Sequence, residues 1–291
     1  MTLRYRQVDV FAASPYQGNG LAVFRDQGEL TVSQMQAVAR ELNQAESIFL
    51  TSTGQPHQVA ARIFTPAEEL PFAGHPLLGA AAVLHLDGQD SRGEVSWEFR
   101  LAADRVVPVR SQAHGSSFTA RMDQGPASFL PPLPTDQAGV ILAGLGLDRS
   151  QQHASLPLQV VSTGLPYLIV PLQTGIAEAR IVHPAFGDLL ATLGAKFAYL
   201  LDPAVPEGRT WDNAGGSEDP ATGSAAGPAG AFLVRHGLRR AGVCIHVRQG
   251  GRTGRPSEIR VTVEPDGATL RVAVEGDIWP VGEGSLEVPP P

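Results

Sequence analysis

The chain of 291 residues is long enough for two domains, and its 43% hydrophobic and 18% charged residues are typical of a globular protein. A net charge of −7 argues against a general binding surface for nucleic acid or for anionic membranes. The single cysteine, Cys244, excludes an internal disulfide, a cysteine-based metal cluster and any mechanism that needs two thiols.

The sequence also predicts where the protein resides. No apolar run approaches the roughly 18 residues that a membrane-spanning helix needs. The first residues enter a strand-like pattern at once and lack the apolar core of a signal peptide. We therefore expect a cytoplasmic protein.

The first half of the chain alternates predicted strands with two predicted helices. Apolar residues at helical spacing predict a helix from Val32 to Leu42, with Thr31 or Ser33 as its N-cap. An almost wholly apolar run predicts a second, buried helix over about 75–86. β-branched and aromatic runs between turn signals predict strands at 7–12, 21–25, 47–51, 59–65, 94–100, 106–110 and 117–123.

The second half repeats this plan after a proline-rich segment, 125–135, which the sequence predicts to be a linker or a surface excursion. Helices are predicted at about 184–193 and 224–236, the second of them buried. The end of the chain, 288–291, is expected to fray. Strands are predicted at 158–161, 167–172, 196–201, 243–248, 258–263 and 269–274.

A short motif occurs once in each half. Residues 71–80 and 220–229 both read Pro-x-x-Gly-[His/Ser] and both open an apolar, alanine-rich run with helical character. A helix start offers unpaired N–H groups and the positive end of the helix dipole, which suit a carboxylate. Two such helix starts that face one cleft would hold a small anion between them.

These patterns predict an α+β fold of two pseudo-symmetric domains, each a curved, mostly antiparallel sheet around a central helix. The first domain is expected at 1–124 and the second at 125–277, and the tail at about 278–291 could return to the first. Because a cleft between two domains is a favoured place for a ligand, the active site is expected there.

Glu46 is the first candidate catalytic residue. It opens a predicted strand, and Ile48 and Leu50 would share its face. If that face is the inner one, burial would raise the pKa of Glu46 towards the range useful for proton transfer at neutral pH. The alternative is a solvated glutamate at the end of a strand.

His75 is the second candidate, in the first turn of the first buried helix. Gly74 before it would let a ligand approach the backbone closely, and Pro76 suits a first helical turn. His75 would then orient a substrate or relay a proton beside an anion pocket. The alternative is a histidine that only caps the helix.

Asp219 is the matching candidate in the second half, close to Gly223 and Ser224 of the repeated motif. Ser224 can cap the second buried helix, and Thr222 or Asp219 can add bonds to the same end. A purely structural role for Asp219 is the alternative, because an acidic residue is favoured near a helix start. The repetition of the motif favours a functional role instead.

Other kinds of site are not supported by the sequence. The eight histidines are scattered and form no metal-binding motif, so no metal is expected. The glycine-containing segments 18–20 and 250–255 lack the patterns of a dinucleotide fingerprint and of a P-loop. A Gly-x-Ser-x-Gly elbow is absent, which argues against a serine hydrolase.

Taken together, these residues resemble the PhzF-like family, named for the isomerase of phenazine biosynthesis. The most specific matches are Glu-Leu-Pro-Phe-Ala-Gly-His-Pro-Leu-Leu-Gly at 69–79 and Glu-Asp-Pro-Ala-Thr-Gly-Ser-Ala-Ala-Gly-Pro at 218–228. Further matches lie at 8–12, 18–19, 21–24, 39–43, 46–47, 62–66, 249–250 and 254–257, so the resemblance covers nearly the whole chain.

The resemblance implies a diaminopimelate-epimerase-like fold with two barrel-like domains, usually in a homodimer. It implies acid–base chemistry without cofactor or metal, with Glu46 as catalytic glutamate and His75 and Asp219 as its polar partners. Gly74, Gly223 and Ser224 match the loops that hold the substrate. In phenazine-pathway members the substrate is trans-2,3-dihydro-3-hydroxyanthranilate, whose C3 proton is removed and returned at C1.

The sequence therefore predicts an isomerase that moves a proton on a small, carboxylate-bearing substrate, with Glu46 as the single acid/base. Trans-2,3-dihydro-3-hydroxyanthranilate is the first expected substrate. One alternative is a related isomerase, tautomerase or epimerase-fold enzyme that acts on another amino or hydroxy acid. Another alternative is a non-catalytic, anion-binding protein that kept the fold.

Overall fold

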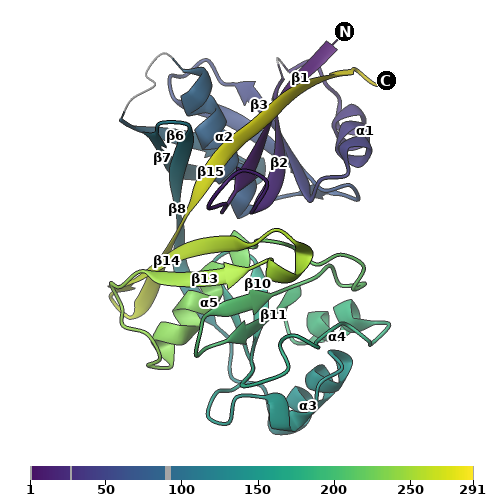
Figure 1. Ribbon diagram of the computed structural model, residues 1–291, viewed down its shortest axis with the longest axis vertical. Coiled ribbons are helices and arrows are strands. Elements are labelled where there is room, and N and C mark those ends of the chain that lie inside the picture. The colour runs from purple at the N-terminus through teal and green to yellow at the C-terminus, as the bar shows by residue number, and fades with distance from the viewer. Residues whose placement is uncertain (1, 27, 89–92, 291) are drawn as a thin grey trace. The chain divides into compact units, whose positions relative to one another are not determined.

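The computed structural model describes residues 2–26, 28–88 and 93–290. Its fold is α+β with a mostly antiparallel sheet, as the sequence predicts. The chain divides into two compact units, shown in Figure 1. Unit 1 comprises Met1–Asp123 with Glu275–Pro291, and unit 2 comprises Gln124–Val274.

Unit 1 is a ring of strands. Starting from the N-terminus the strands are β1 (Thr2–Val10), β2 (Asn19–Asp26), β3 (Glu46–Ser52), β4 (Gln58–Phe64), β6 (Glu94–Arg100), β7 (Val106–His114), β8 (Ser117–Phe129) and β15 (Thr269–Glu287), with the short β5 (Glu69–Leu70) beside β4. Each strand pairs with the next in this order, β15 pairs with β1, and an additional pairing of β15 with β8 closes the ring. The β2–β3 and β4–β6 pairs are parallel.

Helix α2 (Gly74–Asp87) lies among the strands of unit 1 (Figure 1). Every residue from Gly74 to His85 is buried, because the helix is apolar on all of its sides and contacts β1, β2, β3, β6 and β7. Helix α1 (Val32–Leu42) instead packs one buried stripe against β3 and β4. Its capping box joins Thr31 and Gln34, and Asn43 ends it in the left-handed conformation.

Unit 2 repeats the arrangement around α5 (Gly223–Arg235), which contacts five strands and is buried from Ala225 to Leu233. Helices α3 (Thr135–Gly144) and α4 (Phe186–Thr192) contribute to a separate apolar cluster. Short 3₁₀ turns lie at Ala102–Asp104, Arg149–Gln151 and Gly251–Thr253. The strand order runs from β8 through β9 (Gln159–Ser162), β10 (Pro166–Pro171), β11 (Phe197–Asp202), β12 (Glu207–Arg209), β13 (Ile245–Gln249) and β14 (Ser257–Asp266) to β15.

The two buried helices begin at the same place in the repeated motif. Helix α2 starts at Gly74 and α5 starts at Gly223, one residue before each predicted start. The preceding residues, Ala73 and Thr222, make no side-chain capping bond to the helix. Both helices therefore begin without a side-chain cap. The expected cap of α5 by Ser224 is wrong, because Ser224 is the second residue of that helix and its hydroxyl bonds Tyr167.

The predicted linker or surface excursion at 125–135 is wrong for 125–129, whereas 130–134 is a mostly exposed connection. Strand β8 continues to Phe129, and α3 begins at Thr135, so only a short connection lies between them. Buried positions alternate as far as Gln124, which is the signature of a half-buried strand, and Ala127 is buried again after a shift of one residue at Gly125 and Pro126. The prolines obscured this alternation. Strand β15 likewise runs on to Glu287, well beyond the predicted strand end at 274.

Among the described residues, no helix is both long enough and apolar enough to cross a bilayer.

Candidate active site

Glu46 takes its position from the elements on both sides of it. Helix α1 ends at Asn43, and Glu46 is the first residue of β3, in parallel register with Leu21 of β2. Ile48 and Leu50 farther along the strand are buried, and the Glu46 side chain is itself only 16% exposed. The carboxylate therefore lies in a mostly desolvated position, and the raised pKa expected for it stays a prediction.

His75 lies directly against this carboxylate. Its Nε2 atom is 3.3 Å from Oε2 of Glu46, and the imidazole side chain is 5% exposed. Burial lowers the pKa of His75 to about 3, because the charged imidazolium loses its hydration there. At neutral pH the ring is uncharged, so it can give or take one hydrogen bond but does not neutralise Glu46.

The start of α2 adds donors next to this pair. Ala73 is extended and makes no side-chain capping bond, and Gly74 opens the helix in a buried position. The N–H groups of the first helical turn point away from the helix body and suit a carboxylate ligand. Unit 1 thus combines a carboxylate, a neutral imidazole and a helix start within one short stretch of space.

The corresponding residues of unit 2 form a tight turn at the start of α5. One Asp219 oxygen accepts a hydrogen bond from the Ala221 N–H at 3.2 Å, and the other accepts one from the Thr222 hydroxyl at 2.6 Å. Ser224 shares a hydrogen bond of 2.9 Å with the hydroxyl of Tyr167. Asp219 therefore shapes the loop before Gly223, whatever else it does.

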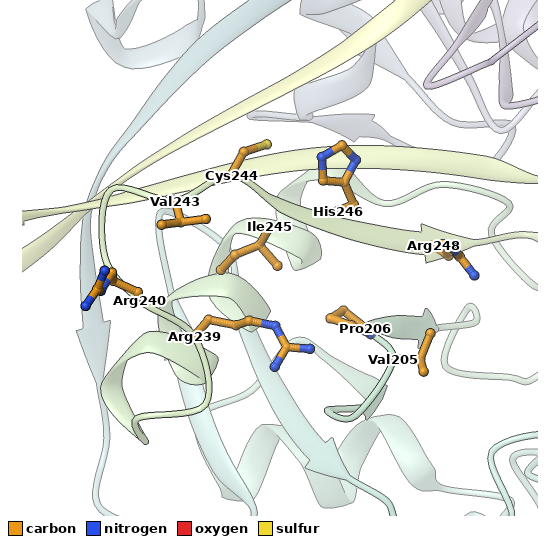
Figure 2. Close-up of a pocket in the computed structure, with 9 residues that line it drawn as sticks. All are labelled: Val205, Pro206, Arg239, Arg240, Val243, Cys244, Ile245, His246 and Arg248. Carbon is orange, nitrogen blue, oxygen red and sulfur yellow. The ribbon is translucent and has the colours of Figure 1, made fainter.

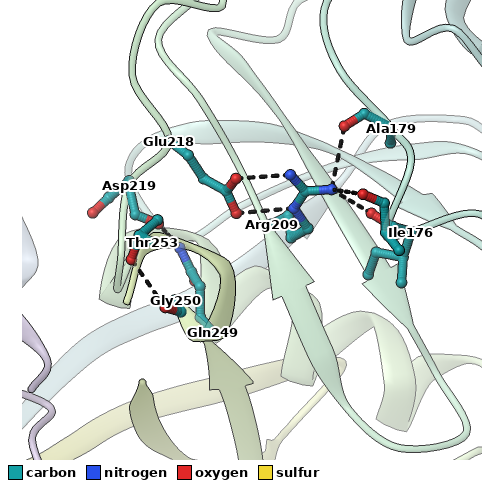
Figure 3. A network of polar contacts seen from close by, with 9 residues as sticks. Ile176, Ala179, Arg209, Glu218, Asp219, Gln249, Gly250 and Thr253 are labelled. Atoms are coloured by element: carbon teal, nitrogen blue, oxygen red, sulfur yellow. Dashed lines mark hydrogen bonds and ion pairs between the residues drawn. The ribbon is translucent and has the colours of Figure 1, made fainter. Parts of the chain in front are cut away.

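A buried ion pair anchors the segment that leads into Asp219 (Figure 3). Arg209 binds Glu218 through two hydrogen bonds of 2.9 and 2.7 Å, and it also donates to the carbonyl groups of Ile176 and Ala179. The Arg209 side chain is 8% exposed, so the bidentate pair is largely shielded from water. Because Glu218 precedes Asp219 directly, this pair fixes the approach of the chain to the turn.

Sequence reasoning missed the role of Gln249, which it had noted only as part of a late motif. The Gln249 amide binds Asp219 and Thr222, and Tyr199 donates to it. The signal was present in the pattern of β13, where Gln249 follows Ile245 and Val247 on the inward face. A polar side chain at the end of an inward-facing row needs hydrogen-bond partners.

The structure thus brings the predicted residues together in two groups. Glu46, His75 and Gly74 meet in unit 1, and Asp219 lies close to Gly223 and Ser224 in unit 2. That both groups serve one substrate in a cleft between the domains stays a prediction.

Two hollows in the molecule lie apart from these residues. One of about 270 Å³ in unit 2 is lined by arginines and Cys244 (Figure 2), but the Arg239 guanidinium is engaged with the carbonyl groups of Pro203 and Ala204. The other, of about 510 Å³, lies in unit 1 near the C-terminal end of α2, beside Asp87. Neither is lined by a predicted site residue.

Comparison with known proteins identifies the family. The family model described as phenazine biosynthesis-like protein matches residues 8–284. A trans-2,3-dihydro-3-hydroxyanthranilate isomerase of Pseudomonas aeruginosa is 35% identical, over 93% of this chain and 93% of its own.

Solved structures agree on the fold. A predicted epimerase from Pseudomonas aeruginosa is 46% identical with a TM-score of 0.92, covering 98% of this chain and 99% of that one. A PhzF-family protein from Bacillus anthracis has a TM-score of 0.85 at 23% identity, covering 99% of this chain and all of that one. The chain belongs to the phenazine biosynthesis-like family and is an isomerase.

Proposed function

We propose that this protein shifts a proton within a small, carboxylate-bearing molecule without a cofactor, and that Glu46 is its acid/base. The observation that carries the proposal is the contact of 3.3 Å between Glu46 and a buried, uncharged His75 beside the start of α2. A charged histidine would hold Glu46 in a salt bridge, whereas a neutral one forms no ion pair that would oppose protonation of the carboxylate.

The chemistry follows from these groups. Glu46 removes a proton from carbon, the electron pair moves along an adjacent unsaturated system, and Glu46 returns the proton to a second carbon. No atom or electron is gained or lost, so the step needs no redox partner. His75 orients the reacting group by a hydrogen bond, and the N–H groups beginning at Gly74 hold the substrate carboxylate.

The residues of unit 2 belong to the same proposal. Asp219 acts as the second polar partner of the reaction, while Gly223 and Ser224 hold the substrate with the uncapped start of α5. Support comes from the repetition of the helix start in both units and from the carboxylate oxygens of Asp219, which the turn holds in fixed directions.

Trans-2,3-dihydro-3-hydroxyanthranilate is the substrate that we propose first, supported by the 35% identical Pseudomonas aeruginosa isomerase named for it. A different amino or hydroxy acid is the second candidate. It is favoured by the higher identity, 46%, to another protein of the same species that is described only as a predicted epimerase.

One screen tests both candidates. The protein, dialysed against a metal chelator, is incubated with trans-2,3-dihydro-3-hydroxyanthranilate, and the loss of its ultraviolet absorption is followed. A panel of small amino and hydroxy acids is tested in heavy water by proton NMR for deuterium uptake. Turnover of the first compound assigns the phenazine reaction, and exchange on another acid alone assigns the second candidate. Activity that returns only when metal is added would contradict the cofactor-free mechanism.

We further propose that the protein works as a homodimer in the cytoplasm. The dimer is what the resemblance to the PhzF-like family implies, and the chain belongs to that family. The location is supported by the single cysteine, because disulfide frameworks are features of oxidising compartments. Fractionation of the native cells would place the protein in the soluble fraction, and recovery outside the cytoplasm would contradict the location.

A further inference from the structure

The amide of Gln249 is fully used within the turn that holds Asp219. Its Nε2 atom donates to the Asp219 carbonyl at 2.8 Å and to the Thr222 hydroxyl at 2.9 Å. Its Oε1 atom accepts from the Thr222 N–H at 3.3 Å and from the Tyr199 hydroxyl at 3.1 Å. Two donors and two acceptor positions are all that a glutamine amide offers. The side chain is 3% exposed, so water does not compete for them.

The direction of each hydrogen bond follows from the partners. The Thr222 N–H can only donate and the Asp219 carbonyl can only accept, so the amide cannot be turned around. Because Nε2 donates to the Thr222 hydroxyl, that hydroxyl directs its own proton to Asp219 Oδ2, 2.6 Å away. A chain of donors therefore runs from Gln249 through Thr222 to the carboxylate.

Tyr199 lies at the Gln249 end of this series of hydrogen bonds. It is fully buried, and burial together with the negative charge of Asp219 raises the pKa of Tyr199 far above its usual value. The phenol thus keeps its proton and stays a donor to Gln249. The Ala221 N–H donates to the second oxygen of Asp219. Donors to both oxygens favour the ionised carboxylate and fix its plane.

The glycine after Gln249 allows the backbone there to approach the turn that holds Asp219. Gly250 has a φ of +77°, and a Cβ there would lie 2.3 Å from the Arg255 carbonyl oxygen and 2.4 Å from that of Pro220. Only glycine fits both the left-handed conformation and this approach to the residue after Asp219. Gln249 and Gly250 therefore act together. Gln249 makes the hydrogen bonds to the turn, and Gly250 allows the close backbone approach that these bonds require.

We propose that Gln249, acting through Thr222, is a positioning residue that sets the orientation and charge of Asp219 at the start of α5. The inference rests on the proposed function, because the action of Asp219 on a substrate is itself part of that proposal. Gln249 itself has no donor or acceptor left for a ligand. It acts on the reaction only through its neighbours.

Matched substitutions separate this role from general loss of structure. Gln249→Glu keeps the shape and removes both N–H donors, and Thr222→Val removes the hydroxyl, whereas Thr222→Ser keeps it. We expect the first two to lower kcat about ten- to a hundredfold, with a smaller change in KM and the acidic limb of the pH profile moved to higher pH. Thr222→Ser and Gln112→Glu, at an exposed position on β7, should keep the wild-type profile.

A second readout keeps the inference testable without any substrate. Carbon NMR of the Asp219 carboxyl group gives the pH at which it titrates in each folded variant. A midpoint at higher pH in Gln249→Glu and Thr222→Val, but not in Thr222→Ser, supports the inference even if no compound is turned over. An unchanged midpoint in Thr222→Val overturns it, and this pair decides the matter should Gln249→Glu fail to fold.

Discussion

Glu46 and His75 are two titratable side chains in contact, and both are largely buried. Burial keeps His75 uncharged, so the pair is a carboxylate beside a neutral hydrogen-bonding ring and not an ion pair. A carboxylate in an ion pair would be stabilised as the charged form and would be a poorer proton acceptor. A neutral ring makes no such ion pair with Glu46.

The neutral state of His75 has a consequence for stability. Its pKa is about 3 in the folded chain against 6.5 in the unfolded one, so below pH 6.5 the unfolded chain binds the extra proton. Stability is therefore full above pH 6.5 and falls as the pH drops towards 3. At pH 5 the loss is about 2 kcal/mol.

Urea unfolding at pH 7.5 and pH 5 measures this effect. We expect His75→Gln to lose about 2 kcal/mol less than the wild type between the two pH values. His114→Gln, which changes an exposed histidine at the end of β7, serves as control and should follow the wild type. An equal loss in wild type and His75→Gln would show that His75 is charged in the folded protein.

At single positions, local sequence patterns were enough to identify candidate site residues. The start of a strand after a helix drew attention to Glu46, and the glycine before an apolar helix drew attention to His75. The contact between them could not be predicted from the residues alone. Strand β3 contacts α2 only because the ring of strands forms around that helix. The same holds for Gln249, whose partners lie 27 to 50 residues earlier in the chain.

At the scale of elements, the apolar character of α2 and α5 was enough to predict that both are buried. The proline-rich segment misled the prediction, since β8 continues through Pro126 to Phe129. Strand ends depend on which partners a strand finds, and β8 finds β9 at its end. Pairing of this kind is a tertiary property that local composition does not encode.

The close packing of α2 leaves no room for a larger residue at Gly79. A Cβ at Gly79 would lie 2.5 Å from Cδ2 of Leu21 and 3.0 Å from Cγ2 of Val10. Gly79→Ala should therefore destabilise the protein by about 1–3 kcal/mol, although alanine favours a helix by about 1 kcal/mol. Denaturant unfolding measures the difference.

Gly139→Ala in α3 is the matched control. Its nearest neighbour, Arg149, would lie at an ordinary 3.6 Å, so the gain in helix propensity should dominate. We expect stabilisation by about 0.5–1 kcal/mol. Equal effects of the two substitutions would mean that α2 is not packed as tightly as the distances indicate.

At the scale of the whole molecule, β8 and β15 each contribute to both units. Glu275–Pro291 belongs to unit 1, so the N-terminal and C-terminal segments of the chain form one compact body. This organisation places one buried helix and one repeated motif in each unit.

The proposed homodimer is tested at this scale. Light scattering at micromolar concentration should give twice the chain mass of 30.7 kDa. A mass equal to that of one chain, at concentrations where the enzyme is active, would show that a dimer is not required.

The most direct test of the account is the turnover of Glu46→Gln beside Glu41→Gln, an equivalent change at an exposed position on α1. Both are measured at saturating substrate, with the compound that the screen identifies, and both are checked for wild-type unfolding. We predict that Glu46→Gln lowers kcat about 100- to 10,000-fold, while Glu41→Gln keeps the wild-type rate. Wild-type turnover by a folded Glu46→Gln would contradict the central claim that this carboxylate moves the proton.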